Sequence, residues 1–248
     1  MIRSTSRIRT GACLLAASAL GLFLAACSDS GERPAASEYG NSTTSAQAPD
    51  TAQAEPAASA LEAPPSQGSV DMAELLEPGP LPEIVLGEPD APVTIVEYAS
   101  TTCPHCANFH NNTLPALKKE YIDTGKVRLV LREFPFDPRS EAGFMLARCS
   151  EDKYVAMLDV LYKQQSSWAG VENARDALLQ IARLAGFSQE SFEACLTNQE
   201  LLDDIRAVRQ RGAEDFGVEA TPTFFVNGQK YPGNMSIEEM SAIIDSAA

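Results

Sequence analysis

Basic residues are scarce in this sequence. The 248-residue chain has 19 lysines and arginines against 34 aspartates and glutamates, which gives a formal net charge of -15 at pH 7. A chain with this balance repels the phosphate backbone of nucleic acids, so we expect no nucleic-acid partner. It also lacks the basic patch of proteins that bind anionic membrane surfaces through charge. Solubility is a sufficient explanation for the excess of acid.

Histidine is almost absent, which limits the metal sites that the chain can build. The two histidines are His105 and His110. A zinc site would have to combine both with Cys103 and Cys106, and four ligands in so short a stretch would be sterically crowded. A c-type haem attachment needs His directly after the second cysteine, where the sequence has Ala107. We therefore predict no metal and no cofactor, and we expect His110 on the surface of a helix.

Long apolar runs are scarce, and the run near the start is short for a membrane-spanning helix and is soon followed by polar residues. Residues 1–26 have the composition of a signal peptide, with arginines near the start and a short apolar run from Gly11 to Ala26. The run ends in Leu24-Ala25-Ala26-Cys27, which resembles the bacterial lipobox, in which the cysteine is lipidated and becomes the first mature residue. An ordinary cleaved signal and a single anchor helix are the alternatives. In each case the folded part is exported. We expect a lipid on Cys27 that anchors the protein to a membrane, with the folded part in the periplasm.

Residues 27–80 lack a core-forming pattern. Ala, Ser, Thr, Pro, Glu and Gln dominate and aliphatic residues are sparse, so burial of apolar surface cannot offset the entropy lost on ordering. We predict a lipid-anchored, disordered linker over 27–80, which lets the anchored domain work away from the membrane. Residues 81–248 are enough for one domain with its own hydrophobic core.

The apolar pattern of residues 81–248 predicts strands on both sides of a block of helices. The helical block covers about 139–216, and a last helix over 237–247 begins with a capping box at Ser236 and Glu239. Asn227-Gly228 predicts a tight hairpin between the last two strands. The strands are expected at 83–86, 92–98, 127–133, 223–226 and 229–231.

A further helix is expected to begin near Cys103. The threonines before this cysteine can cap the helix, and Pro104 fits its first turn. Pro115 lies inside the same apolar pattern, so we expect a kink or a restart near Thr113. Ser150 is expected to cap another helix, within the helical block.

Four of the six cysteines fall within the predicted domain. The two-residue gap makes Cys103 and Cys106 a natural pair, and Cys149 and Cys195 are then left for each other. This second bridge would close a loop of about 47 residues and could stabilise the fold by ~4 kcal/mol in the chain-entropy model. Two buried free thiols are the alternative.

Cys103-Pro104-His105-Cys106 lies at the junction of a predicted strand and a predicted helix. A helix N-terminus offers free backbone N–H groups and the positive end of the helix dipole, and both stabilise a thiolate. Cys103 is therefore a candidate nucleophile, and Cys106, one turn later, can resolve a mixed disulfide. Pro104 restricts the turn, and His105 can hydrogen-bond to the thiolate. The motif predicts thiol–disulfide exchange.

A second motif, Thr221-Pro222 followed by the strand and hairpin at 223–228, makes the prediction more specific. Together with Cys-Pro-His-Cys it resembles the thioredoxin superfamily, and the large helical block resembles that of the DsbA family, over about 83–247. The resemblance implies an α/β thioredoxin fold with a helical insertion between the third and fourth strands.

The resemblance also implies roles for particular residues. Cys103 is the nucleophile and Cys106 the resolving cysteine. Pro222 is a cis-proline that faces them, and it turns the backbone of Thr221 toward the disulfide so that a substrate chain can pair with it. Glu97 occupies the position of a buried acid that helps to move the proton of Cys106. An exposed acid at a strand edge is the alternative for Glu97.

By this resemblance the chain is a monomeric oxidase that introduces disulfides into exported proteins with free thiols, and a membrane redox partner recycles it. Thr221 departs from the best-known enterobacterial DsbA, which has Val there, whereas isomerases of the superfamily commonly have Thr. An isomerase or reductase kept reduced by a membrane donor is therefore an alternative. A non-catalytic binding lipoprotein of the envelope is a second alternative, although such a protein has no use for the thiols of both Cys103 and Cys106. The extra cysteine pair and the lipoprotein tether resemble DsbA-like proteins of α-proteobacteria.

Overall fold

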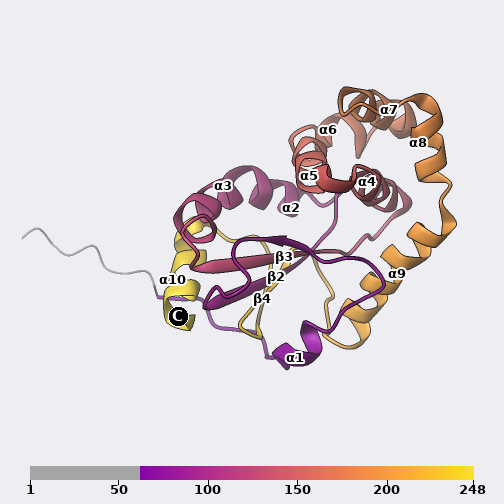
Figure 1. Ribbon diagram of the computed structural model, residues 1–248. Coiled ribbons are helices and arrows are strands. Elements are labelled where there is room, and N and C mark those ends of the chain that lie inside the picture. The colour runs from indigo at the N-terminus through magenta and orange to yellow at the C-terminus, as the bar shows by residue number, and fades with distance from the viewer. Residues whose placement is uncertain (1–61) are drawn as a thin grey trace, which may run out of the picture. The chain divides into compact units, whose positions relative to one another are not determined.

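A five-stranded sheet in the order β1-β3-β2-β4-β5 organises the part of the chain that the structure describes, residues 62–248 of a computed structural model (Figure 1). β2 and β3 run parallel, and every other neighbouring pair is antiparallel. Each predicted strand is present, with its ends within one residue of the prediction. The strands are β1 Ile84–Leu86, β2 Val93–Ala99, β3 Val127–Glu133, β4 Thr223–Val226 and β5 Gln229–Pro232.

The two faces of the sheet bury different sets of side chains because alternate residues of a strand point to opposite sides. Ile95 and its neighbours on one face join the larger core, beneath α2 (Pro104–Asn108), α3 (Leu114–Leu117) and α10 (Ile237–Ala247). Val96 and Tyr98 on the other face join a smaller cluster with Leu75 of α1 (Met72–Leu75). α2 and α3 lie above the sheet in Figure 1 and α1 lies below it. Glu97 has the same parity as Ile95 and therefore faces the larger core.

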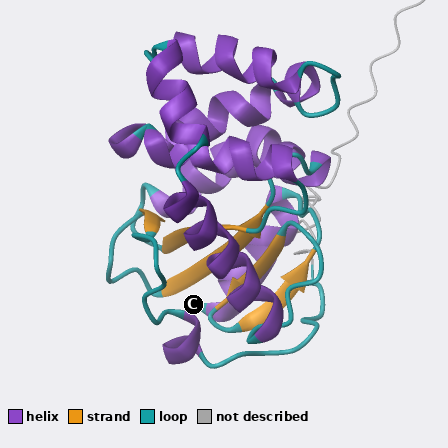
Figure 2. Cartoon of the chain, turned by 90° about the vertical axis from the view of Figure 1, so that its right-hand side faces the viewer, coloured by secondary structure: helices purple, strands orange, loops and turns teal. Residues whose placement is uncertain are grey.

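The helical block enters the chain between β3 and β4, so the predicted α/β fold with its insertion is confirmed. Most of the inserted helices gather at one end of the sheet, and the last of them runs back alongside it (Figure 2). The first of them begins at Pro138, earlier than predicted, because the Asp137 carboxylate accepts hydrogen bonds from the backbone N–H groups of Arg139 and Ser140. The helices are α4 Pro138–Cys149, α5 Tyr154–Lys163, α6 Gln165–Trp168, α7 Ala174–Leu184, α8 Gln189–Leu196 and α9 Gln199–Glu214, with a short 3₁₀ turn at Glu151–Lys153.

Two predicted helix caps are wrong. Cys103 itself precedes α2 and no side chain caps that helix, although Pro104 does occupy the first turn. The Ser150 hydroxyl donates back to the Ala147 carbonyl at 2.6 Å instead of capping the helix that follows. By contrast, the capping box of Ser236 and Glu239 is present at α10.

The helical run after Cys103 changes its pitch where an interruption was predicted. A π-helical turn, Phe109–Thr113, separates α2 from α3, and the Leu114 N–H donates to the Phe109 carbonyl, five residues back. Pro115 follows directly and has no N–H to donate. A second π-helical turn, Lys118–Ile122, ends the run. The widened turn rotates the side chains after α2, and this decides which of them face the sheet.

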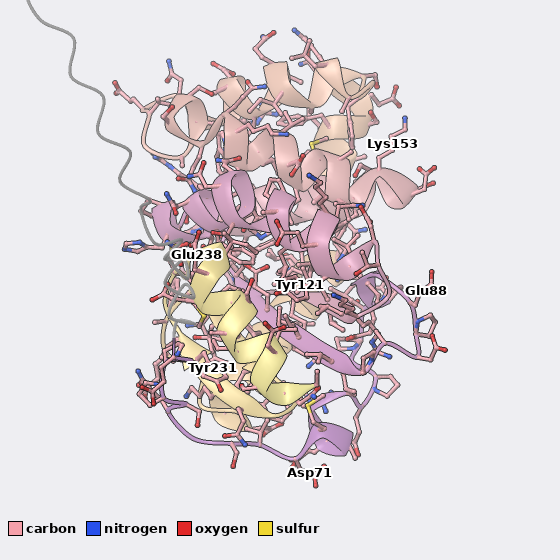
Figure 3. All side chains as sticks on the ribbon, turned by 90° about the vertical axis from the view of Figure 1, so that its left-hand side faces the viewer. Asp71, Glu88, Tyr121, Lys153, Tyr231 and Glu238 are labelled. Carbon is pink, nitrogen blue, oxygen red and sulfur yellow. A yellow bond between two sulfur atoms is a disulfide. The ribbon has the colours of Figure 1, made fainter. Side chains whose placement is uncertain are left out.

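The segment from residue 62 to residue 80 packs against the sheet, so the prediction of a disordered linker as far as residue 80 is wrong. The Val70 N–H donates to the Gly228 carbonyl at 2.9 Å, and the backbones of Gln67 and Lys230 are bonded at 2.8 Å. Leu75 is fully buried. Because these contacts cover the otherwise open edge at β5, a few backbone hydrogen bonds and one buried leucine order a segment whose composition is polar. Figure 3 shows Asp71, which caps α1, at the same end of the domain as the last turns of α10.

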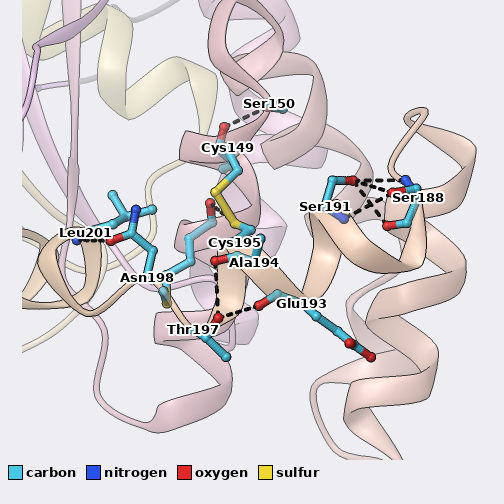
Figure 4. The surroundings of a disulfide bond; sticks show 12 residues. Cys149, Ser150, Ser188, Ser191, Glu193, Ala194, Cys195, Thr197, Asn198 and Leu201 are labelled. Carbon is cyan, nitrogen blue, oxygen red and sulfur yellow. Dashed lines mark hydrogen bonds between the residues drawn. A yellow bond between two sulfur atoms is a disulfide. The ribbon is translucent and has the colours of Figure 1, made fainter.

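Cys149 and Cys195 form a disulfide that joins α4 to α8 (Figure 4), as predicted. The sulfur atoms are 2.08 Å apart and the bridge closes a sequence separation of 46 residues. Within residues 62–248, no helix has the length and apolar character needed to cross a bilayer. The predicted signal peptide, Cys27 and the linker up to residue 61 lie outside the described residues.

Candidate active site

Cys103 lies where β2 ends and α2 begins. Its backbone is extended, with φ -75° and ψ 121°, and its carbonyl accepts the first helical bond from the Ala107 N–H at 3.1 Å. The Cys103 side chain is partly exposed, whereas Cys106, one turn later, is fully buried, and neither sulfur is in a disulfide. The motif therefore presents one accessible thiol and one sheltered thiol.

Thr221 and Pro222 face Cys103 across the site, although 118 residues separate Thr221 from Cys103. The Thr221–Pro222 peptide bond is cis, as predicted. The Cys103 thiol donates to the Thr221 carbonyl, with 3.1 Å between sulfur and oxygen. The Gly233 N–H donates to the Pro222 carbonyl at 2.8 Å, so the loop after β5 holds the cis-proline loop in place. The Thr221 hydroxyl has no hydrogen-bond partner among the described residues.

The helical insertion holds the loop that carries Cys103. Thr102 donates its hydroxyl hydrogen to the Asp137 carboxylate at 2.6 Å. The Gln165 amide donates to the Thr101 and Cys103 carbonyls, each at 2.9 Å. Sequence reasoning missed Asp137 and Gln165 at the site. Asp137-Pro138 was a readable helix start, but no local pattern indicated that either side chain reaches the loop at 101–103.

Hydrogen bonds to the sulfur hold the pKa of Cys103 at about 5, well below its usual value of 9.0. The Cys106 thiol makes the largest contribution. Burial of the sulfur acts in the opposite direction, and Thr221 and the backbone N–H groups of Cys106 and His105 lower the pKa further. The neutral thiol donates to the Thr221 carbonyl, whereas the thiolate accepts from the Cys106 thiol and from these backbone N–H groups. At neutral pH Cys103 is therefore a thiolate.

Cys106 has the opposite character. Burial raises its pKa well above 9.0, and the hydrogen bond with Cys103 and the negative charge of Glu97 raise the pKa further. One sulfur is therefore an accessible thiolate and the other a sheltered neutral thiol. This asymmetry allows Cys103 to act as the nucleophile or the leaving group, and Cys106 to react only after a mixed disulfide has formed on Cys103.

Alkylation of the reduced protein should report the low pKa of Cys103. We expect the rate of modification by iodoacetamide, followed by mass spectrometry, to rise with pH to half its maximum near pH 5. The unfolded chain should show a midpoint near pH 9. Because the folded pKa is depressed, the stabilisation of the reduced fold is complete above pH 9 and is lost as the pH falls to 5. A midpoint near 9 in the folded protein would contradict the assigned hydrogen bonds.

Glu97 and His110 form a buried pair, and the charge of Glu97 acts on Cys106. The Nε2 atom of His110 is 3.1 Å from both carboxylate oxygens of Glu97. Glu97 is 0% exposed, which excludes the exposed strand-edge acid, while its part in proton transfer stays a prediction. His110 is 3% exposed, so its predicted place on the helix surface is wrong. Its spacing of four residues from Cys106, on one helix face, was the signal that could have placed it inside.

The remaining residues of the motif, Pro104 and His105, are exposed beside Cys103. The His105 backbone N–H contributes to the low pKa of Cys103. A hydrogen bond from its imidazole to the thiolate stays a prediction. Among residues 62–248, no three or more His, Cys, Asp or Glu side chains are arranged to hold a metal ion.

Comparison with known proteins places the chain in a family. Residues 81–246 match the model of a family described as thioredoxin. The chain belongs to the thioredoxin family. A Rickettsia typhi protein, described as a candidate protein-disulfide oxidoreductase, is 37% identical over 167 residues, which are 66% of this chain and 62% of that protein. This chain thus spans about three fifths of the length of such rickettsial relatives. A Bacillus anthracis protein named "Probable disulfide bond formation protein D" is 31% identical over 64% of this chain and 76% of its own length.

Solved structures of the same fold include DsbA proteins. Wolbachia pipientis α-DsbA1 is 33% identical with a TM-score of 0.65, over 70% of this chain and 94% of that one. Bacillus subtilis BdbD in its oxidised form is 21% identical with a TM-score of 0.60, over 75% of this chain and 98% of that one, and shows the shared fold alone.

Proposed function

We propose that this chain is a thiol–disulfide oxidoreductase that works as a dithiol oxidase on exported proteins. The observation that carries the proposal is the asymmetry of the two cysteines, with a partly exposed Cys103 of pKa about 5 beside a buried Cys106 of raised pKa. A stable thiolate stabilises the reduced form, so the disulfide form is a strong oxidant. The family and the names of its relatives support the same chemistry.

The reaction begins with the disulfide between Cys103 and Cys106. A substrate thiolate attacks the Cys103 sulfur, the bond between the two cysteines breaks, and the sulfur of Cys106 leaves and takes up a proton. A second substrate thiolate then attacks the substrate sulfur of the mixed disulfide. Cys103 leaves as a thiolate, which its low pKa favours. The substrate gains a disulfide and the chain gains two electrons, which a membrane redox partner would remove.

The cis-proline loop supports the way in which a substrate would bind. Thr221 presents its carbonyl at 3.1 Å from the Cys103 sulfur. An extended substrate segment can pair with the backbone of Thr221 as an added strand, which places its cysteine against Cys103 without a demand on sequence. The substrates we propose are therefore unfolded or partly folded proteins with free thiols. We propose that the chain acts on them as a monomer.

The compartment follows from different observations. The bridge of Cys149 with Cys195 is of a kind that persists in oxidising compartments. Together with the signal-like residues 1–26, this supports a periplasmic protein that is held at the membrane by lipid on Cys27. Fractionation of cells tests the anchor. The parent should sediment with membranes and Cys27→Ala should not, and a Cys27→Ala chain that stays with the membranes would overturn the lipid anchor.

The oxidase function is tested by mixing the oxidised full chain with two substrates. A reduced dithiol peptide should be oxidised rapidly, with loss of one disulfide from the chain per peptide. A protein with scrambled disulfides should be corrected slowly by the reduced chain. Rapid correction with slow peptide oxidation would favour the isomerase alternative, which Thr221 supports because isomerases of the superfamily commonly have Thr there. If the chain exchanges disulfides with neither substrate, the non-catalytic binding lipoprotein is the function that remains.

A further inference from the structure

The pair of Glu97 and His110 lies in the core rather than at the surface. Glu97 projects from the centre of β2, where it pairs in register with Leu131 of β3 and Phe224 of β4. His110 comes from the π-helical turn after α2, and its ring lies 4.3 Å from the ring of Tyr162 on α5, at an angle of 30°. The central strands of the sheet, the π-helical turn and α5 therefore enclose one carboxyl group and one imidazole.

The other titratable and charged groups around the pair come from several elements. Cys103 precedes α2 and Cys106 lies within it. α5 contributes Tyr154 and Tyr162, whose pKa values burial raises well above 10.0. Glu133 of β3 accepts a hydrogen bond from the Tyr154 hydroxyl at 3.0 Å and is paired with Arg148. Among the described residues, the salt-bridge partner of Glu97 is His110.

Because the Glu97 carboxyl is buried, its charge depends on the hydrogen bond with His110. A carboxylate removed from water is destabilised unless a donor compensates it, and an unpartnered buried acid takes up a proton. The Nε2 atom of His110 reaches both oxygens at 3.1 Å. When it donates, it supplies the compensation that a buried carboxylate requires.

The exchange reaction needs such an acceptor near Cys106. Cys106 is a neutral thiol with a raised pKa, on which the charge of Glu97 acts directly. In the direction that regenerates the disulfide, this thiol must lose its proton before its sulfur can attack Cys103. In the opposite direction, the Cys106 thiolate that is released must gain a proton. Cys106 is 0% exposed, so a group within the core has to supply or accept it.

We propose that His110 is a positioning residue of the resolving step, which holds Glu97 ready, through its Nε2–H, to exchange a proton with Cys106. When a mixed disulfide stands on Cys103, the Cys106 proton passes to the pair, the Cys106 sulfur attacks the Cys103 sulfur, and the partner leaves as a thiolate. The reverse step returns the proton to Cys106. The inference deepens the proposed exchange chemistry and rests on it, but it holds for either direction of electron flow.

Two substitutions at His110 separate the hydrogen bond from the packing. His110→Phe keeps a ring that can stack on Tyr162 and removes the donor to Glu97. His110→Gln keeps an N–H donor and removes the ring. In the full reduced chain, oxidised glutathione first forms a mixed disulfide on Cys103, and Cys106 then resolves it. Acid quenching and mass spectrometry between pH 6 and pH 8 follow both steps.

We expect His110→Phe to resolve the mixed disulfide about tenfold more slowly than the parent at pH 7, a modest share of what positioned proton transfer supplies. Its rate should rise steeply with pH, as Cys106 comes to depend on solvent base. His110→Gln should resolve it at close to the parental rate. Parental behaviour in His110→Phe, or equal slowing in both variants, would overturn the proposal.

Glu97→Gln is the matched variant on the other side of the hydrogen bond. It should slow resolution at least as much as His110→Phe, and the double variant should be no slower than Glu97→Gln, because the two side chains act as a unit. Glu97→Gln also decides the matter if His110→Phe fails to fold, since resolution at the parental rate would contradict the proposal. A parent that forms no mixed disulfide on Cys103 would instead refute the proposed function.

Discussion

Replacement of Cys106 by Ala is expected to stop the chain at a mixed disulfide on Cys103, whereas replacement of Cys103 by Ala should reduce exchange to the uncatalysed rate. Cys103 is the partly exposed sulfur with a pKa of about 5, so it alone can meet a substrate as a thiolate. Cys106 is buried, so a substrate does not meet it directly. Without Cys106 the first exchange still occurs, but no neighbouring thiol remains to displace the bound partner.

Mass spectrometry of the variants after incubation with oxidised glutathione checks this expectation. Cys106→Ala should gain one glutathione and keep it, while Cys103→Ala should gain none on Cys106 in the same time. The matched control removes the other pair, Cys149 and Cys195, and should resolve as the parent does. Rapid labelling of Cys106 in Cys103→Ala would contradict the assignment of the nucleophile.

Removal of the bridge between Cys149 and Cys195 should cost about 4 kcal/mol of the free energy of unfolding. The two cysteines are separated by 46 residues in the sequence. Without the bridge the unfolded chain gains conformational entropy, and this gain lowers the free energy of the unfolded state. It joins α4 to α8, so its loss also frees the ends of two packed helices. The double variant with Ala at both positions is preferable to a single one, which would leave an unpaired reactive thiol.

Denaturation in guanidinium chloride measures this loss, with the parent and the double variant both kept oxidised at Cys103 and Cys106. The variant should unfold at a clearly lower midpoint and retain the pH profile of Cys103 alkylation, because the groups that set that pKa lie around Thr221 and α2. A loss below about 1 kcal/mol would mean that the unfolded chain is already restricted in this loop. A shifted alkylation profile would mean that the bridge supports the site through α4.

Local patterns in the sequence predicted the sheet and the two facing motifs. Each strand signal depended on neighbours within a few residues, and the cysteine pairs followed from their spacing. Thr221 and Cys103 could be brought together only through the family resemblance, because 118 residues separate them. The structure confirms that contact and the cis bond at Pro222.

Contacts that depend on three-dimensional packing escaped prediction. Gln165 and Asp137 reach the active-site loop from the helical insertion, and neither side chain is unusual in its local sequence. His110 was placed outside because a histidine on an amphipathic helix is commonly exposed, whereas here it faces a buried acid on β2. The ordered stretch before residue 81 was missed because backbone pairing with β5 leaves no apolar pattern.

The reduction potential of the Cys103–Cys106 couple tests the proposed oxidase most directly. It is measured on the full chain by equilibration with glutathione redox buffers, and mass spectrometry counts the alkylated thiols. A thiolate stabilised to a pKa of about 5 predicts an oxidising couple, near the value of about -120 mV known for DsbA. A potential near that of thioredoxin, about -270 mV, would contradict the oxidase and indicate a reductant.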